Sequence, residues 1–335
     1  MTLQFWPVAG IGEIVTGDNL AQIIVEAPGN PLADGDVVIV TSKIVSKAAG
    51  LATTGDRDDL MAAQTDRIVA KRGPTTIVRT HHGLTMAAAG IDASNIAVGS
   101  VIPLPPDPDH DANDLRRQLY ELAGVTVGVI ITDTSGRAWR IGQTDIAIGV
   151  SGIKPYLSFN GAKDAYGNVL AVTAPAIADE IAGAADLVAE KLGGIPVVVA
   201  RGLPADWLHA GDGQGAVSLI RDENSDLFGL GSLDAVLAAA GHGNALRGFP
   251  MPAGDATTRL IAAAREGTNV DLADVRMLCG GVLEVYLASE ETSPKALIAM
   301  GVLAERLRIL TRAMRVDIPI MLAAVHCRHG YQHRQ

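Results

Sequence analysis

Three short runs of apolar, mostly β-branched residues punctuate the sequence and predict buried strands. They lie at Asp36–Ser42, Thr126–Thr132 and Ile195–Ala200. Apolar side chains at consecutive positions are typical of strands that are covered on both faces. The pattern therefore predicts a sheet packed between helices.

Between these runs, apolar residues recur at helical spacing. The predicted helices are Leu60–Lys71, Asp111–Ala123 and Thr173–Leu192. Residues 101–114 hold four prolines, which disfavour both a regular helix and a strand ladder, so we expect a loop there. Asp111 or Asn113 can cap the helix that follows.

The character of the chain changes after about residue 203, where it becomes rich in turn-forming and acidic residues. Beyond it, Leu233–Ala240 and Lys295–Met314 read as helices and Val282–Leu287 as a strand. We place a domain boundary near residues 230–245, which divides the chain into residues 1–235 and 236–335. The predicted fold class is mixed α/β.

Composition narrows the possible functions. The chain has 335 residues, 48% of them hydrophobic, so it can bury a large core, and its net charge of −10 argues against sequence-independent binding of nucleic acid. Cys279 and Cys327 are too few for a disulfide framework. The N-terminus does not resemble a signal peptide, and no apolar run reaches the roughly 18 to 20 residues that cross a bilayer. We expect a cytoplasmic protein without a membrane partner.

Oxygen-bearing side chains gather in the motifs "AGIDASN" (89–95) and "TDTSGR" (132–137). Asp133 and Thr134 end a predicted strand with a carboxylate beside a hydroxyl, and Asp92 adds a second carboxylate. Hard cations such as Mg²⁺ and Mn²⁺ prefer such ligands. Either motif alone is also typical of turns and helix caps, so the two motifs together carry the metal-site hypothesis.

Basic residues follow the same strands. Arg137 and Arg140 can bind a phosphate or carboxylate through two hydrogen bonds, or can be surface arginines around Trp139. Lys43 and Lys47 follow the first buried strand in a position from which a lysine can reach a phosphate. No Walker sequence occurs in the chain, so a P-loop enzyme is not expected.

The order of motifs over about residues 5–229 resembles the coenzyme F420-0:L-glutamate ligase family. The resemblance rests on "DGDVVIVTSKIVSKAAG", "THHGLTMAAAGIDASN" and "GVIITDTSGRAWRIGQTDIAIGVSGIKP". It implies a two-part γ-glutamyl-ligase-type body, here followed by a small C-terminal α/β appendage of unknown role. Some relatives carry a fused flavin-binding domain, but the last hundred residues lack its signature, so we expect no flavin.

The resemblance implies GTP-dependent addition of L-glutamate to F420-0 by a homodimer that uses two Mg²⁺ or Mn²⁺ ions and K⁺. An acyl phosphate would activate the carboxylate for attack by the amine. The implied metal ligands are Asp92, Asp133, Thr134 and Glu190. The implied nucleotide contacts are Gly12, Glu13, Ile14, Val15, Ser46, Lys47 and Asn95. Arg137 and Arg140 would hold an anionic substrate group during catalysis.

The sequence departs from the family pattern at a few positions. Ala49 and Leu51 replace a Glu and an Arg, and Ala88 replaces an Asn. Losing an arginine beside the nucleotide weakens phosphate binding. Two alternatives follow: a nucleotide- or deazaflavin-binding protein with reduced catalysis, and a metal-dependent GTP phosphohydrolase that needs neither co-substrate.

Overall fold

The structure is a computed structural model that describes residues 2–93, 96, 99–190, 193–222, 225–226, 228–231, 235, 256–265, 268–288, 292–313 and 317–323. The chain divides into two compact units, Met1–Arg221 and Asp222–Gln335. This division falls before the boundary predicted at residues 230–245. Each unit is described by itself.

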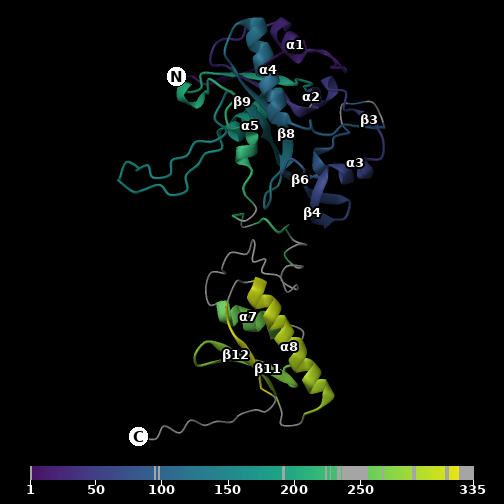
Figure 1. Ribbon diagram of the computed structural model, residues 1–335, viewed down its shortest axis with the longest axis vertical. Helices are drawn as coiled ribbons and strands as arrows, with labels where there is room; N and C mark the ends of the chain where they lie inside the picture. The colour runs from purple at the N-terminus through teal and green to yellow at the C-terminus, as the bar shows by residue number, and fades with distance from the viewer. Residues whose placement is uncertain are drawn as a thin grey trace. The chain divides into compact units, whose positions relative to one another are not determined.

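Within its described residues, the first unit is built around a five-stranded sheet with the order β1-β10-β2-β8-β9 (Figure 1). The strands are β1 Gln4–Pro7, β10 Val197–Arg201, β2 Val37–Thr41, β8 Gly128–Gly136 and β9 Gln143–Ser151. β2 and β8 run parallel, whereas the other neighbours are antiparallel. The three strands predicted from apolar runs are all present, and the mixed α/β class is confirmed.

Alternate residues of β2 point into two different cores, as the geometry of a strand requires. Val38 and Val40 pack into the core that holds α1, α2 and α4, whereas Val37 and Ile39 pack into the core that holds α5. The helices are α1 Leu20–Glu26, α2 Ser42–Ala48, α4 Pro108–Ala123 and α5 Ile177–Ala189. Burying each valine or isoleucine side chain contributes about 1.5 to 3 kcal/mol, which explains the continuous apolar runs.

Helix α4 begins earlier than the sequence predicted. The side chain of Asp107 accepts a hydrogen bond of 3.0 Å from the backbone nitrogen of His110, and Pro108 occupies the first helical turn. A proline fits there because its missing N–H has no partner in the first turn. The prediction of a loop through residue 114, with a cap at Asp111 or Asn113, was therefore wrong.

The part of the chain that connects α2 to α4 forms a smaller part of the first unit. It contains β3 Thr53–Thr54, α3 Arg57–Gln64, β4 Thr65–Arg72, β5 Thr75–Thr80, β6 Thr85–Ala87, the 3₁₀ helix η1 Ala88–Gly90 and β7 Ser100–Val101. The predicted helix Leu60–Lys71 was wrong after Gln64, because the following residues pair with β5 as strand β4. Ladder hydrogen bonds to a partner strand outweighed the weak helical spacing.

The second unit is a small α/β structure in its described part. It consists of α7 Ala256–Arg265, β11 Ala273–Leu278, β12 Val282–Leu287, α8 Pro294–Ala313 and β13 Ile320–Ala323. Met300, Leu303 and Leu307 of α8 are buried in its core. The predicted strand Val282–Leu287 and the long helix are confirmed, whereas the predicted helix Leu233–Ala240 lies almost wholly outside the described residues.

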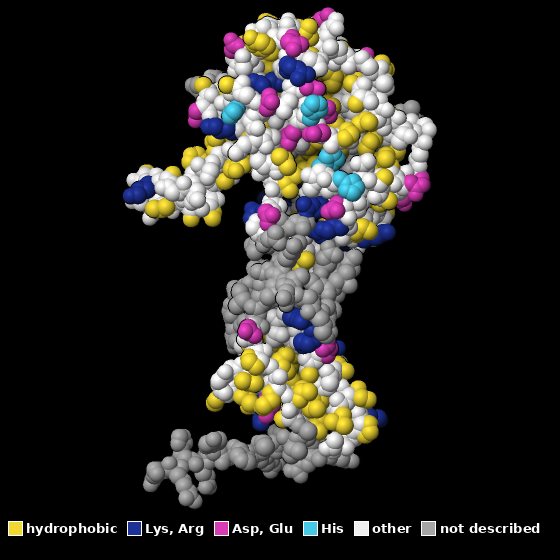
Figure 2. Space-filling model, in the orientation of Figure 1, with side chains coloured by type: hydrophobic (Ala, Val, Ile, Leu, Met, Phe, Trp, Pro, Cys, Tyr) yellow, Lys and Arg dark blue, Asp and Glu magenta, His cyan; other side chains and the backbone are white. Residues whose placement is uncertain are grey.

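Residues 157–175 form an arm that projects from the first unit (Figures 1 and 2). Backbone hydrogen bonds join its two limbs, for example Phe159 N to Thr173 O at 2.9 Å. At its tip, Asp164 accepts from the backbone nitrogens of Tyr166 and Asn168. The arm carries exposed apolar residues: Phe159, Tyr166, Val169 and Val172.

Across the described helices of both units, none combines the length and apolar character needed to cross a membrane.

Candidate functional site

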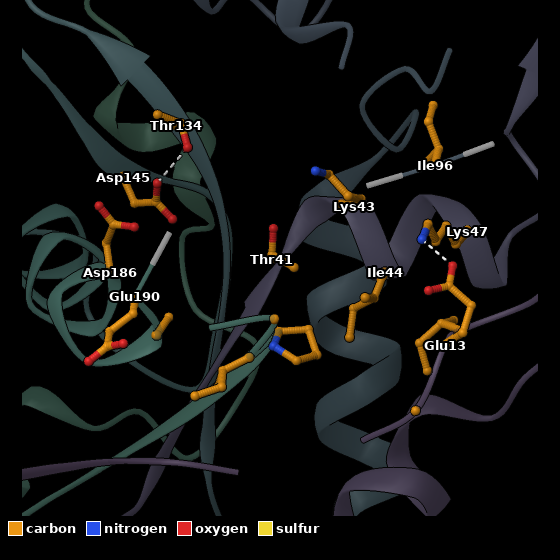
Figure 3. Close-up of a pocket in the computed structure, with 16 residues that line it drawn as sticks. Glu13, Thr41, Lys43, Ile44, Lys47, Ile96, Thr134, Asp145, Asp186 and Glu190 are labelled. Atoms are coloured by element: carbon orange, nitrogen blue, oxygen red, sulfur yellow. Dashed lines mark hydrogen bonds and ion pairs between the residues drawn. The ribbon is translucent and has the colours of Figure 1, made fainter. Parts of the chain in front are cut away.

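A cavity of about 710 Å³ lies at the end of the parallel strands β2 and β8 (Figure 3). In α/β proteins, ligands bind outside the carboxyl ends of parallel strands because the chain splays apart there. The lining residues come from the loop after β1, the end of β2, α2, the segment around Ile96, the β8–β9 hairpin, the end of α5 and the segment before β10. They are Gly12, Glu13, Ile14, Thr41, Lys43, Ile44, Lys47, Ile96, Thr134, Asp145, Asp186, Ala189, Glu190, Gly194, Ile195 and Pro196.

Two lysines line one side of the cavity, together with Glu13, and three carboxylates line the other side (Figure 3). Lys43 and Lys47 are four residues apart on α2 and so share a helix face, whereas Asp145, Asp186 and Glu190 lie across the cavity. The ammonium group of Lys47 lies 2.5 Å from a carboxylate oxygen of Glu13. The side chain of Lys47 is 10% exposed, so its charge is more weakly screened by water than that of a surface lysine.

Asp92 reaches the same region from the smaller part of the first unit. Its backbone forms a bridge with Ile102 through hydrogen bonds of 3.0 and 2.9 Å, which fixes the turn after "AGI". Its carboxylate lies 2.6 Å from the ammonium nitrogen of Lys43. Asp92, a predicted metal ligand, is thus in direct contact with Lys43, a lysine predicted to be able to reach a phosphate.

Asp133 and Thr134 are neighbours in β8 and therefore point to opposite faces of the strand. The carboxylate of Asp133 accepts a hydrogen bond of 3.0 Å from the hydroxyl of Ser42, the first residue of α2. The hydroxyl of Thr134 instead donates to Asp145 at 2.9 Å, and Thr134 lines the cavity. The carboxylate and the hydroxyl thus have different neighbours.

Burial raises the pKa of Asp133 from 3.8 to about 7. The hydrogen bond from Ser42 lowers this pKa, and the negative charges of Asp145 and Asp92 raise it further. A carboxylate placed among other carboxylates in a poorly hydrated site favours the neutral form unless a cation is nearby. Such perturbed carboxyl groups gather at functional sites.

The donors at this end of β8 are all oxygen atoms, which suits Mg²⁺ or Mn²⁺ better than a softer metal. In the described part of the chain, no group of three or more His, Cys, Asp or Glu side chains is arranged to hold a metal ion. Mg²⁺ commonly takes one or two carboxylates and completes its shell with water and substrate phosphates. Asp92 and Asp133 lie beside α2, against Lys43 and Ser42, whereas Thr134 lies on the other face of β8, against Asp145. The structure therefore does not bring the three predicted ligands to one point, and Asp92 with Asp133 suits a different ion from Thr134.

The predicted nucleotide contacts have different positions. Gly12, Glu13, Ile14 and Lys47 line the cavity. Val15 is 57% exposed and is not among the lining residues. Ser46 is fully buried, and its hydroxyl donates to the carbonyl of Pro103 at 2.8 Å, so it holds α2 against the following loop. Asn95 lies outside the described residues.

The two predicted arginines lie at the tip of the β8–β9 hairpin. Arg137 and Arg140 are exposed, and neither lines the cavity. A guanidinium nitrogen of Arg137 donates to the carbonyl of Ile141 at 3.2 Å, within the tip. Glu190, the remaining predicted metal ligand, lines the cavity at the end of α5, where its φ of 54° turns the chain out of the helix.

Thr41, Asp145 and Asp186 also line the cavity, although no motif in the sequence pointed to them. Asp145 lies directly opposite Thr134 in the hairpin register. The segment "GQTDIAIG" shows a polar start and an apolar continuation, which is a signal for a returning strand. The register of this strand against β8 could not be predicted from the sequence, because the pairing of the two strands is irregular between Ile131 and Thr132.

Fold and site together define a class: an α/β protein that sets two lysines against several carboxylates at the carboxyl end of a parallel strand pair. A family model described as F420-0:Gamma-glutamyl ligase matches residues 10–58 and 54–202. The chain belongs to this family.

Its similarity to curated relatives covers them almost completely. A coenzyme F420:L-glutamate ligase of Methanosarcina mazei is 42% identical over 248 residues, which are 68% of this chain and 96% of the relative. Relatives with the same name are 36% identical in Methanothermobacter thermautotrophicus, over 68% of this chain and 99% of the relative, and 38% identical in Archaeoglobus fulgidus, over 68% and 97%. About a third of this chain thus has no counterpart in these relatives.

Proposed function

We propose that the protein catalyses the GTP-dependent ligation of L-glutamate to coenzyme F420-0. One observation carries the proposal. In a chain of the F420-0:gamma-glutamyl ligase family, Lys43 and Lys47 face a set of carboxylates across one cavity at the end of β2 and β8. Such a cavity can hold the phosphates of a nucleotide and a cation together.

The reaction needs an activated carboxyl group, because a carboxylate is a poor electrophile. A carboxylate oxygen of F420-0 would attack the γ-phosphorus of GTP, and GDP would leave. The amine of glutamate would then attack the carbonyl carbon of the acyl phosphate, lose a proton and displace inorganic phosphate. Catalysis of phosphoryl transfer is mainly positioning and charge stabilisation, which Lys43 and Lys47 can supply to the phosphate oxygens.

Asp92 and Asp133 would hold one of two Mg²⁺ or Mn²⁺ ions, and Thr134 would hold the other, with Glu190 as a further ligand from the acidic side. Bound divalent ions neutralise the charge that builds on the phosphate oxygens during transfer. Asp92 now pairs with Lys43. A cation at Asp92 would therefore leave the ammonium group of Lys43 available for a phosphate. K⁺ remains a further cation that the family resemblance implies.

Arg137 and Arg140 would bind an anionic group of the substrate from the hairpin tip. β8 continues from Thr134 through Ser135 and Gly136 directly into this tip. The two guanidinium groups are exposed and can therefore form paired hydrogen bonds to a carboxylate or phosphate without first breaking a buried contact.

We further infer that the protein forms a homodimer through the arm of residues 157–175. Tyr166 and Val172 are each 92% exposed and Val169 is 62% exposed on this ordered projection. Exposed apolar side chains gathered on one projecting segment are typical of interaction surfaces. Light scattering at micromolar concentration should give twice the mass of the chain, and Val172→Asp should reduce it to that of a monomer.

Mass spectrometry of the product tests the activity. The protein is incubated with GTP, Mn²⁺, L-glutamate and F420-0, and each component is omitted in turn. We expect F420-0 to gain glutamate only in the complete mixture, with one GDP formed per glutamate. GDP formation without either co-substrate would instead support a phosphohydrolase, and binding without turnover would support a protein with reduced catalysis.

A further inference from the structure

The carboxylate of Asp145 joins two threonines of the neighbouring strand. Asp145 in β9 lies opposite Thr134 of β8, and Thr132 is two residues away on the same face. The hydroxyl of Thr134 donates to one carboxylate oxygen of Asp145 at 2.9 Å, and the hydroxyl of Thr132 donates to the other at 3.0 Å. Each oxygen of Asp145 thus fixes one hydroxyl group.

These two bonds determine what the hydroxyl of Thr134 can bind. A threonine hydroxyl has one proton to donate and two lone pairs. An ionised carboxylate only accepts, so the proton of Thr134 is directed at Asp145. Any other partner in the cavity must therefore approach a lone pair of Thr134. A cation or an N–H group can do so, whereas an ionised phosphate oxygen cannot.

The surroundings make this arrangement rigid. Thr132 is 3% exposed, so its hydroxyl has little access to water. Hydrogen bonds to an ionised carboxylate are shorter and about twice as strong as those between neutral groups. Both Thr134 and Asp145 line the cavity (Figure 3), so the oriented lone pairs are placed where a ligand can meet them.

We propose that Asp145 is a positioning residue that orients Thr134 as an oxygen ligand for the divalent cation. The inference rests on the proposed function, which requires such a cation. Carboxylates that orient a metal ligand commonly affect metal affinity by about 10- to 100-fold. Asp145 therefore acts through Thr134, and the strength of cation binding depends on the hydrogen bond between them.

The test measures Mn²⁺ affinity by electron paramagnetic resonance on the full-length protein, without substrates. Asp145→Asn keeps the shape but replaces the carboxylate by a neutral amide, whose oxygen accepts a weaker hydrogen bond from the hydroxyl of Thr134, so we expect the Mn²⁺ dissociation constant to rise at least about 10-fold. Thr134→Val should produce a similar loss, whereas Thr134→Ser should rescue binding. Thr132→Val is the matched control, since it removes only the other hydroxyl, and should change affinity less than about 3-fold.

The double variant Asp145→Asn with Thr134→Val separates positioning from direct binding. If Asp145 acts through Thr134, the second substitution adds little to the first. A further large loss would mean that Asp145 binds the ion itself, and normal Mn²⁺ affinity in Asp145→Asn would equally overturn the inference. Absence of Mn²⁺ binding by the unchanged protein, in the presence of GTP as well as without it, would refute the proposed divalent cation as well. Thermal unfolding of each variant controls for loss of fold, and Thr134→Val tests the same hydroxyl while leaving Asp145 in place.

Discussion

Replacing Asp133 by Asn is expected to stabilise the metal-free protein while removing its ligase activity. Burial raises the pKa of Asp133 from 3.8 to about 7 in the folded state. Each pH unit between the folded and unfolded pKa values corresponds to about 1.4 kcal/mol. Keeping Asp133 ionised in the folded protein therefore costs up to about 4 kcal/mol of unfolding free energy. Asn avoids this cost, and its carbonyl oxygen can still accept the hydrogen bond from Ser42.

The sign of the pH dependence follows from the raised pKa. As the pH rises, the unfolded chain releases the proton of Asp133 first, so the stability contributed by the neutral group is present below about pH 4 and is lost by about pH 7. The advantage of Asp133→Asn over the unchanged protein should therefore be near zero at pH 4. It should reach roughly 1 to 2 kcal/mol at pH 5 and up to about 4 kcal/mol at pH 8.

Denaturant unfolding followed by tryptophan fluorescence is the appropriate assay. Trp6, Trp139 and Trp207 all belong to the first unit, so the signal reports on the unit that holds Asp133. Mn²⁺ should stabilise the unchanged protein at pH 8 and should stabilise Asp133→Asn much less. An equal stability difference between the two proteins at pH 5 and pH 8 would refute the reasoning, because the effect would then not arise from ionisation.

Further outcomes follow from other parts of the structure. Lys47→Met should raise the KM for GTP about 10-fold or more, since hydrogen bonds to charged groups contribute about 1.5 to 3 kcal/mol, and Lys163→Met on the exposed arm should not. Gly149→Ala should lower the unfolding free energy by roughly 1 to 3 kcal/mol, because the added Cβ would lie 2.2 Å from a backbone oxygen at the start of α4. Gly55→Ala is its control, with open space around the added atom. Leu303→Ala should destabilise the second unit by about 2 to 5 kcal/mol and leave the rate of glutamate addition unchanged, as activity assays at a low temperature can show.

Much of the scaffold could be predicted from local patterns. The buried strands β2, β8 and β10 carry unbroken β-branched runs, because a strand covered on both faces has no solvent side. The long helix α8 and the strand β12 were predicted within about a residue. The prediction of a helix over Leu60–Lys71 was wrong after Gln64. Helical spacing depends only on nearby residues along the chain, whereas β4 forms by pairing with the separate strand β5.

The candidate site shows the same limit more sharply. The sequence by itself indicated Asp92, Asp133 and Thr134, because they stand in two short motifs rich in oxygen-bearing side chains, and Lys47, because it follows the first apolar run. It could not indicate that Asp133 bonds to Ser42 whereas Thr134 bonds to Asp145. Those contacts join segments far apart along the chain, or depend on a hairpin register with an irregularity in it. Only tertiary packing brings these groups within hydrogen-bond distance, and burial there raises the pKa of Asp133, so the electrostatics of the site belong to the fold and not to any single motif.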